Sequence, residues 1–369
     1  MTIFFLQTFA IQGVINCIKI KPPIAYLSHM KRHATTIKDI ARKLNISPST
    51  VSRALKDKPE INIETRLAVK RVAKELNYQP NSLALSLLHS KSNTIGVIVP
   101  EIIHFFFSTV ISGIEDVSRK RGYNVIIAQS NESAEQEISN LQTMFSNRVD
   151  GILVSISKAS HDLSHFETSI ENGLPIVFFD RVAENLKSSK VTVDDFMGGY
   201  QATEHLLAEG YRRIAHSAGP KGLDITTERL EGYKKAHVDA GIEFDERLVI
   251  YDMNSNEFDH FKAIYDLVKD QNPDGLFASN DLAAMSGIKA AQKCGKQIPE
   301  DFGVVGFSNW QFTELTNPSI STIEQSGYKM GQCAAELLLK QIDSKEDDVP
   351  TEIVKLPTRL IVRDSSKKN

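Results

Sequence analysis

The stretch that decides the fold of the first domain is Thr36-Ile37-Lys38-Asp39-Ile40-Ala41-Arg42-Lys43-Leu44-Asn45-Ile46-Ser47-Pro48-Ser49-Thr50-Val51-Ser52-Arg53-Ala54-Leu55. Thr36 is a typical cap residue, and the acid at Asp39 can reach back to the first turn, so a helix is expected over 37–44. Ser47 followed by Pro48 starts a second helix, because serine caps well and proline suits the first helical position. Two short helices across a tight turn are therefore predicted.

A third helix is expected directly after this pair. Asn62 is its cap, and it runs to about Leu76, with Leu67, Ala68 and Val72 on its inner face together with Leu76. Two short helices followed by a supporting third form a helix-turn-helix, whose second helix fits the major groove of DNA. The alternative from this pattern alone is a small three-helix bundle with no role in nucleic-acid binding.

The charge of the chain is divided between its two parts. The whole sequence of 369 residues has a net charge of -3, which by itself argues against a nucleic-acid binder. Residues 30–93, however, hold 13 Lys and Arg against 5 Asp and Glu, while residues 94–369 hold 28 against 41. A basic module of +8 thus precedes an acidic body of -13, as expected for a nucleic-acid-binding head on a sensing or catalytic body.

The first 29 residues are apolar but interrupted by polar side chains, and they lack a basic start and a clear cleavage site. A secretory signal is therefore a poor fit, and a membrane span is weakened by the polar interruptions. We expect residues 1–29 to be a non-native or disordered extension, with translation starting at Met30. An ordinary composition, with 41% hydrophobic and 24% charged residues, excludes a largely disordered chain.

The rest of the chain alternates short apolar runs with amphipathic segments. Helices are expected between the strands, for example over 109–121, 200–209 and 281–294. Such alternation predicts parallel sheets with helices on both faces. The similar turns Arg121-Gly122-Tyr123 and Glu209-Gly210-Tyr211 point to two similar lobes. The expected strands are 95–99, 124–128, 151–155, 176–179, 191–193, 213–217, 248–250, 275–279 and 303–305.

Polar and aromatic groups gather where the expected strands end. His104-Phe105-Phe106-Phe107, Asp180-Arg181, Asn280-Asp281 and Ser308-Asn309-Trp310 each follow a strand, and Arg229 is expected to begin a helix. Open parallel sheets bind ligands beyond the carboxyl ends of their strands, so a cleft between lobes is the default site. Each group has a structural alternative: Asp281 as a helix cap, or Arg181 paired with Asp180. Together they favour a polar ligand.

Catalytic and metal-binding patterns are absent from the sequence. It has no G-x-G-x-x-G after a strand, no Walker loop, no H-E-x-x-H and no G-x-S-x-G. Its three cysteines have neither metal spacing nor an obvious pairing, which fits a reducing compartment. We therefore expect no enzyme activity, no metal and no cofactor.

The amino-acid sequences of three segments closely resemble the DNA-binding head of the lactose/galactose repressor (LacI/GalR) family: 36–41, 46–55 and Leu76-Asn77-Tyr78-Gln79-Pro80-Asn81. By that resemblance Pro48, Ser49 and Arg53 occupy base-reading positions. Proline offers no side-chain hydrogen bond, so Ser49 and Arg53 should carry more of the reading. The resemblance implies DNA contacts by Thr36, Ser47, Pro48, Ser49, Thr50, Ser52, Arg53, Asn81, Ala84 and Leu87.

The run 81–88 is too short for a stable isolated helix, and an ordinary linker is the alternative to a functional segment. In the resembled family it is a hinge helix that forms on operator DNA. Leu87 matches the leucine that enters the minor groove and kinks the duplex. Leu88 stands where some relatives carry a basic residue, so a phosphate contact is not expected there.

The resemblance also implies an effector site in a two-lobed body similar to periplasmic sugar-binding proteins. His104 stands where many relatives have asparagine, and Asn309 where several have aspartate, which leaves the ligand open between a sugar or sugar derivative and, second, a purine. The effector-binding residues implied are His104, Phe106, Phe107, Asp180, Arg181, Arg229, Asn280, Asp281 and Asn309.

These observations predict an α/β protein with an N-terminal helix-turn-helix head and a two-lobed body with parallel sheets. The expected domains are a DNA-binding domain at 30–80, a hinge at 81–92 and an effector-binding and dimerisation domain at 93–369. Lobe one is expected over about 93–192 and 324–348, and lobe two over about 193–323 and 349–369.

We expect a cytoplasmic, effector-responsive homodimeric repressor of a carbohydrate operon, binding palindromic operator DNA and no membrane. The alternative is a sugar-binding module of transport or chemoreception without a DNA role, whose body would look similar but which would need a signal peptide and no basic head.

Overall fold

The computed structural model describes residues 35–79, 91–252, 257–344 and 350–368. Its contacts divide the chain into two units, Met1–Asn81 and Ser82–Asn369, each with its own hydrophobic clusters. Within the described ranges no helix is long and apolar enough to cross a membrane.

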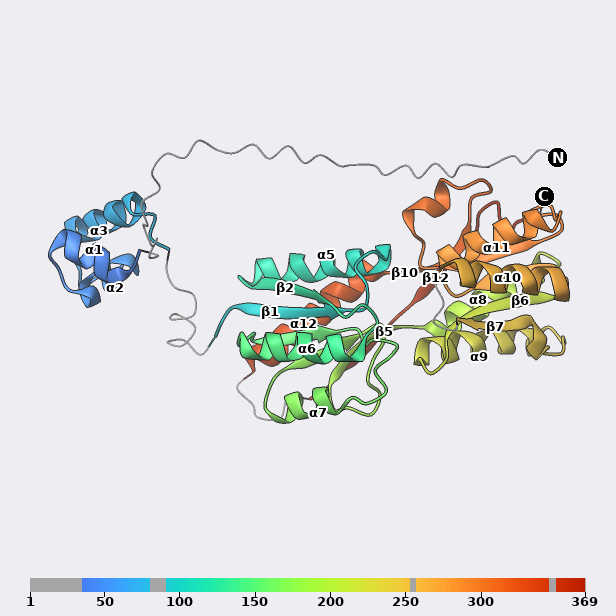
Figure 1. Ribbon diagram of the computed structural model, residues 1–369, viewed down its shortest axis with the longest axis horizontal. Helices are drawn as coiled ribbons and strands as arrows, with labels where there is room; N and C mark the ends of the chain where they lie inside the picture. The colour runs from blue at the N-terminus through green and yellow to red at the C-terminus, as the bar shows by residue number, and fades with distance from the viewer. Residues whose placement is uncertain (1–34, 80–90, 253–256, 345–349, 369) are drawn as a thin grey trace, which may run out of the picture. The chain divides into compact units, whose positions relative to one another are not determined.

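In its described residues, 35–79, the first unit contains three helices (Figure 1). They are α1 (Ile37–Leu44), α2 (Pro48–Leu55) and α3 (Ile63–Glu75). Asn45 adopts a left-handed conformation with φ 54° and ends α1, and the caps Ser47 and Asn62 each accept a backbone N–H three residues on. The helix boundaries predicted from the caps are confirmed.

The inner face of α3 differs from the expected one. Leu67 is 63% exposed, whereas Val69 is fully buried together with Ile40 and Val51. The buried stripe of α3 runs through Val69, Val72 and Ala73, because this is the side that packs against α1 and α2. The prediction of Leu67 as a core residue was therefore wrong, and Val72 was correct.

The second unit contains two six-stranded sheets. The first has the order β11-β5-β4-β3-β1-β2 and the second β12-β10-β9-β8-β6-β7. Among the described strands every pair is parallel except β10 with β12. The strands are β1 (Thr94–Val99), β2 (Asn124–Gln129), β3 (Gly151–Val154), β4 (Ile176–Phe179), β5 (Ser189–Val193), β6 (Ile214–Pro220), β7 (Val249–Asp252), β8 (Gly275–Ala278), β9 (Gly303–Phe307), β10 (Ser321–Gln325), β11 (Ile353–Leu356) and β12 (Thr358–Ile361).

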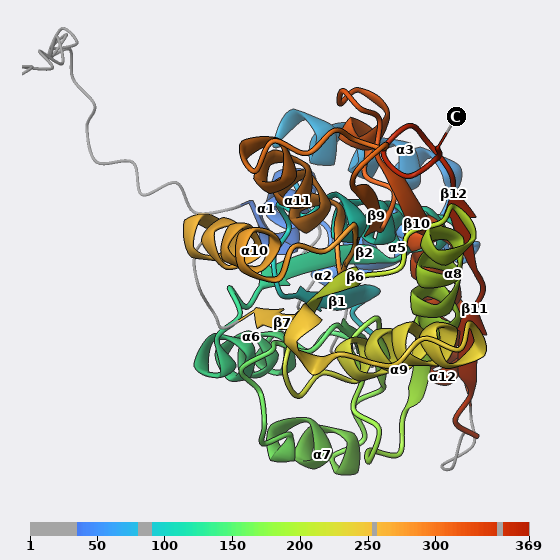
Figure 2. The ribbon, with the colours of Figure 1, turned by 90° about the vertical axis from the view of Figure 1, so that its right-hand side faces the viewer.

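Helices cover both faces of each sheet. In the first lobe α5 and α12 share one hydrophobic cluster and α6 and α7 the other; in the second lobe the pairs are α8 with α9 and α10 with α11 (Figures 1 and 2). The helices are α5 (Phe105–Lys120), α6 (Ala134–Ser146), α7 (Ser164–Glu171), α8 (Asp195–Ala208), α9 (Asp224–Asp239), α10 (Glu257–Gln271), α11 (Asp281–Lys293) and α12 (Gly327–Asp343), with short 3-10 turns at Glu246–Leu248 and Gln311–Glu314. The expected two-lobed α/β architecture is confirmed.

The chain passes between the lobes three times: between β5 and α8, between β10 and α12, and between β11 and β12. The last crossing corrects an expected boundary. Residues 349–369 were assigned to lobe two, but β11 pairs in parallel with β5 in the first sheet. Only from β12 onward does the chain belong to the second sheet, so the boundary lies near Pro357 rather than at 349.

Candidate functional site

A cavity of about 130 Å³ lies between the lobes, where the carboxyl ends of the strands of both sheets meet. Seven of the nine predicted effector residues line it. They come from segments after β1, β4 and β8 and from α9: His104, Phe106, Phe107, Asp180, Arg181, Arg229 and Asn280. Further lining residues include His216, Ser279, Ser308, Trp310 and Gln325.

Arg229 is fixed on the wall of the second lobe by a buried carboxylate. Its Nε and Nη2 both lie 2.7 Å from Oδ1 of Asp195, and its Nη1 donates to the backbone oxygen of Ser279 at 2.8 Å. The guanidinium also lies over the ring of Phe307, 3.7 Å from the centroid. Because a guanidinium carries five N–H groups, Arg229 keeps donors for a ligand. Arg229 was expected from the sequence to begin a helix, but it is the sixth residue of α9, so this prediction was wrong.

The first residue of α8, Asp195, is an important residue that the sequence reasoning missed. It is only 4% exposed, and burial raises its pKa to about 6, although the Arg229 charge acts in the opposite direction. The signal was available, because Asp195 follows an expected strand just as Asp180 does. The role of this carboxylate is to orient Arg229.

Arg181 is paired with Glu132. It is not paired with Asp180, which was the alternative to ligand binding that the sequence left open. Its Nη1 donates to both carboxylate oxygens of Glu132, at 2.8 and 3.0 Å. Asp180 lies next to it with a left-handed backbone, φ 60°, and accepts a hydrogen bond of 3.3 Å from Ser155. Burial raises the pKa of Asp180. The pair thus places a cation and a buried carboxyl group side by side on the wall of the first lobe.

Aromatic rings form the apolar part of the cavity. Phe106 and Phe107 lie in the first turn of α5, which begins earlier than the predicted start at 109, with ring centroids 5.4 Å apart. The rings of His104 and Trp310 lie 5.5 Å apart, and Nε2 of His104 lies 2.8 Å from Glu101. Such ring faces suit the apolar side of a sugar or the plane of a base.

Four buried polar atoms of the cavity walls have no hydrogen-bond partner in the described part of the chain: Arg181 Nε, His216 Nε2, Trp310 Nε1 and Gln325 Oε1. Nε of Arg181 and Nε1 of Trp310 are donors, and Oε1 of Gln325 is an acceptor. Buried polar groups are nearly always paired, so their concentration here indicates a site for a polar ligand.

Asp281 and Asn309 lie behind the wall and do not line the cavity. Asp281 is fully buried and accepts from Trp310 N–H at 2.7 Å and from the Thr322 hydroxyl at 2.5 Å. The side-chain oxygen of Asn309 accepts from Arg363 at 2.9 Å. Their role in the structure is to hold the loop that carries Trp310, while Asn280 is the cap of α11.

The sequence reasoning also missed His216 and Gln325. His216 lies inside the predicted strand 213–217, where its neighbours indicated only a sheet core. Gln325 is the last residue of β10, a strand that was not predicted. No signal in the sequence identified His216, whereas recognition of β10 would have placed Gln325 at a strand end.

In the first unit, α2 presents the predicted DNA-contacting residues to solvent. Ser47, Pro48, Ser49 and Arg53 are exposed, and Thr50 and Ser52 are partly buried. The Ser47 hydroxyl lies 2.7 Å from that of Ser49 and 2.8 Å from that of Thr50. Thr36 directs its own hydroxyl to Asp39, 2.7 Å away. Asn81, Ala84 and Leu87 lie outside the described residues.

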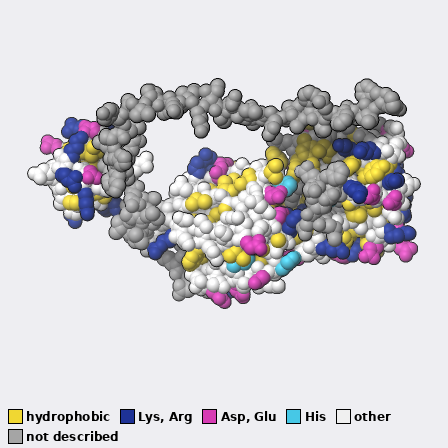
Figure 3. Space-filling model, viewed as in Figure 1, with side chains coloured by type: hydrophobic (Ala, Val, Ile, Leu, Met, Phe, Trp, Pro, Cys, Tyr) yellow, Lys and Arg dark blue, Asp and Glu magenta, His cyan; other side chains and the backbone are white. Residues whose placement is uncertain are grey.

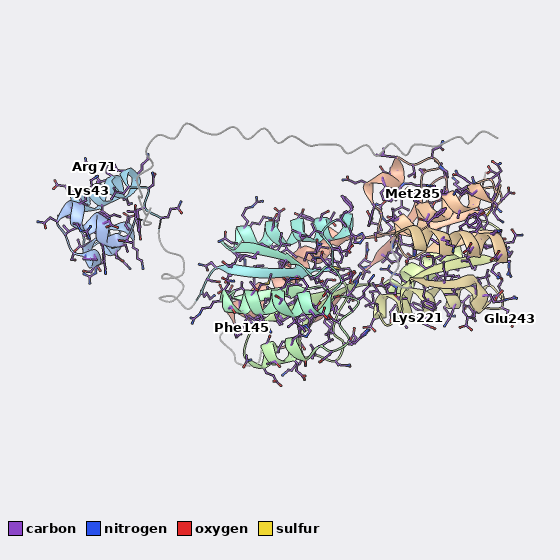
Figure 4. All side chains as sticks on the ribbon, in the orientation of Figure 1. Lys43, Arg71, Phe145, Lys221, Glu243 and Met285 are labelled. Carbon is purple, nitrogen blue, oxygen red and sulfur yellow. The ribbon has the colours of Figure 1, made fainter. Side chains whose placement is uncertain are left out.

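Basic side chains are visible on this unit in Figure 3. Some are paired: Lys43 of α1 and Arg71 of α3 lie 2.8 and 4.0 Å from oxygens of Glu75 (Figure 4). Arg53 forms no ion pair within the residues that the structure describes, so its guanidinium is available to a phosphate or a base edge.

Two family descriptions match this chain. "Bacterial regulatory proteins, lacI family" covers residues 36–81, and "Periplasmic binding proteins and sugar binding domain of LacI family" covers residues 92–363. Together they span both units.

Curated relatives and solved structures agree with these matches. The chain is 36% identical over 336 residues to the ribose operon repressor of Halalkalibacterium halodurans, covering 90% of this chain and 97% of the relative. It is 31% identical to the HTH-type transcriptional repressor CytR of Escherichia coli, covering 90% and 97%.

Among solved structures, a transcriptional regulator CelR-cellobiose complex has a TM-score of 0.68 at 29% identity and covers 90% of this chain and 99% of its own. A LacI family regulator from Enterococcus faecium with bound ribose has a TM-score of 0.66 at 31% identity, covering 74% and 98%.

Proposed function

This chain belongs to the LacI family of bacterial regulatory proteins. We therefore propose that it represses an operon for the use of a carbohydrate, and that a small effector either lowers or raises its affinity for the operator DNA. Its curated relatives are transcriptional repressors and not enzymes, and this chain is a repressor of the same kind. The helix-turn-helix head excludes the alternative of a sugar-binding module without a DNA role.

The observation that carries the effector site is the group of four unpaired buried polar atoms around one cavity, described above. A hydroxyl group can both donate and accept a hydrogen bond. The hydroxyls of one sugar can therefore accept from Arg181 Nε and Trp310 Nε1 and donate to Oε1 of Gln325. Arg229 adds a pre-oriented donor, and the rings of Phe106 and Phe107 pack on an apolar sugar face. A purine is the second candidate, since it is flat and carries donors and acceptors.

Ribose is the first sugar to test. Two similar proteins support this choice: the ribose operon repressor, at 36% identity, and the regulator from Enterococcus faecium, which has bound ribose. In this arrangement Asp180, Arg181, Arg229 and Asn280 contact the ligand directly. Asp281 and Asn309 act indirectly, through the loop that carries Trp310.

On the DNA side, the second helix of the head reads the major groove with Ser49 and Arg53. Ser47 contributes from the cap of this helix, Thr50 and Ser52 from its body, and Thr36 from the start of α1. Asn81, Ala84 and Leu87 contact DNA from the hinge, and Leu87 enters the minor groove, as the family resemblance implies.

The repressor acts as a homodimer in the cytoplasm, where operator DNA is located. The edge strand β2 of the first sheet leaves Ile126 45% and Ile127 37% exposed. An apolar sheet edge is a natural pairing surface. A two-fold dimer presents two heads to a palindromic operator.

The test is a selection of bound sequences from random duplex DNA by the full chain, followed by addition of ribose to the selected complex. We expect an enriched sequence with two-fold symmetry, and a ribose-dependent change in affinity for it. A thermal-shift screen of pentoses, hexoses and purines tests the effector separately, since ligand at 100 times its Kd adds about 2.7 kcal/mol of stability. Absence of any enriched sequence would overturn the DNA-binding function.

A further inference from the structure

His216 is a buried histidine in the wall of the effector cavity. It lies in β6, is fully buried, and is one of the residues lining the cavity. Its ring is stacked on Phe277, with centroids 4.6 Å apart and planes 7° apart, and on Tyr233, with centroids 5.2 Å apart and planes 20° apart. Two aromatic contacts therefore fix the plane of the imidazole.

The hydrogen-bond partner of Nδ1 decides where the ring carries its proton. Nδ1 lies 3.0 Å from the backbone oxygen of Phe277, and a carbonyl oxygen only accepts, so Nδ1 carries the hydrogen. In a neutral imidazole Nε2 is then an acceptor, and it is this atom that has no partner among the described residues.

The surroundings keep the ring neutral. Burial lowers the pKa of His216 to about 4, and the neighbouring Arg229 and His237 act in the same direction. The Phe277 carbonyl has the opposite effect but is outweighed. Nε2 therefore stays a bare acceptor through the neutral pH range.

We propose that His216 is a specificity-determining residue, which accepts through Nε2 a hydrogen bond from one hydroxyl of the effector. The proposal rests on the function proposed above and names the chemistry of one of its contacts. Sugars that lack a hydroxyl at this point leave Nε2 buried and unpaired. Leaving a buried acceptor without its hydrogen bond lowers the affinity for such analogues by about 5- to 100-fold.

The binding test uses the full chain, D-ribose and its 2-deoxy and 3-deoxy analogues in calorimetry. We expect His216→Phe, which keeps the aromatic stack and removes the acceptor, to bind ribose about 5- to 100-fold more weakly. The variant should also lose the preference for ribose over one of the deoxy sugars. A purely structural role would not change that preference.

His237→Phe is the matched control. His237 is also buried, also directs Nδ1 at a backbone oxygen, that of Tyr233 at 2.9 Å, and also contacts the Tyr233 ring, but it does not line the cavity. The control should bind ribose like the wild type. Equal affinity and equal preference in His216→Phe and the wild type would overturn the proposal.

A second measurement does not depend on the choice of sugar. In the free full chain, nitrogen-15 NMR of the histidines should show His216 protonated at Nδ1 and bare at Nε2 between pH 6 and 8. A proton on Nε2 would overturn the proposal. If the wild type binds no pentose, hexose or purine, the effector function proposed above fails, and the protonation of His216 still decides whether the cavity offers this acceptor.

Discussion

At the scale of single residues, Arg53 is the side chain of α2 whose chemistry bears most directly on sequence reading. It is exposed and carries no ion pair within the described residues, so no ion pair among those residues has to be broken on binding. An arginine that reads guanine with two hydrogen bonds contributes about 1–3 kcal/mol of discrimination.

We therefore expect Arg53→Ala to lower affinity for the selected operator by about 10- to 100-fold, with a much smaller loss on random DNA. Fluorescence anisotropy at a fixed salt concentration measures both affinities. Arg71→Ala is the control, because Arg71 is another exposed arginine of the head, on α3, and lies near Glu75 (Figure 4). Equal losses on operator and random DNA would assign Arg53 to phosphate contact instead.

Asp281 gives a prediction for pH dependence. Burial raises its pKa to about 7, despite the Thr322 and Trp310 hydrogen bonds. The folded state thus holds this proton more tightly than the unfolded state. The contribution of the protonated Asp281 carboxyl group to the stability of the folded state is therefore complete below about pH 4. It is lost as the pH rises to about 7.

The free energy of unfolding should fall more steeply from pH 4 to 7 in the wild type than in Asp281→Asn, which has no titrating proton at this site. Urea denaturation at several pH values measures the two slopes. Parallel slopes would show that the carboxyl group of Asp281 does not titrate in this range.

At the scale of elements, local signals explain which parts of the fold were predictable. Caps at Ser47 and Asn62 fixed the helix boundaries of the head, because a cap is a contact within one turn. The expected strands did not include β10 to β12. Of these, β11 pairs with β5, which lies far away in the sequence, so only a tertiary contact defines it. For the site, residues at strand ends were found, whereas the position of His216 depends on its stacking on two side chains that are distant in the sequence, Tyr233 and Phe277.

The crossing of α8 and α9 connects packing to the effector site. A Cβ atom at Gly232 of α9 would lie 2.1 Å from the backbone oxygen of Phe196 in α8, so this glycine is needed for the close approach. The same pair of helices carries Asp195 and Arg229, whose atoms lie 2.7 Å apart. The spacing of the helices therefore sets the position of the Arg229 guanidinium.

Gly232→Ala should separate the two helices and lower stability by about 1–3 kcal/mol, although alanine ordinarily favours a helix over glycine by about 0.5–1 kcal/mol. Affinity for the effector should fall as well, because Arg229 moves with α9. Thermal unfolding with and without ribose measures both effects. Glu231→Ala, at the neighbouring exposed position of the same helix, is the control and should change neither; a more stable Gly232→Ala protein would contradict the argument.

At the scale of the whole molecule, the net charge of -3 conceals two units with opposite charge and separate cores. The cluster of the head is built from α1 to α3, and the described clusters of the second unit draw on the two sheets and their helices. Each unit therefore has the contacts to fold by itself, and the acidic second unit has no net attraction for DNA phosphates.

A chain of residues 91–369 should therefore unfold cooperatively, bind ribose with the affinity of the full chain and lose operator binding entirely. Calorimetry and anisotropy on the two chains, compared at the same salt concentration, measure these properties. Because linkage is reciprocal, any difference in ribose affinity between the full chain with and without operator must equal the change that ribose causes in operator affinity. Loss of ribose binding in the shortened chain would show that the head or hinge helps to build the cavity, and would contradict the division into two independent units.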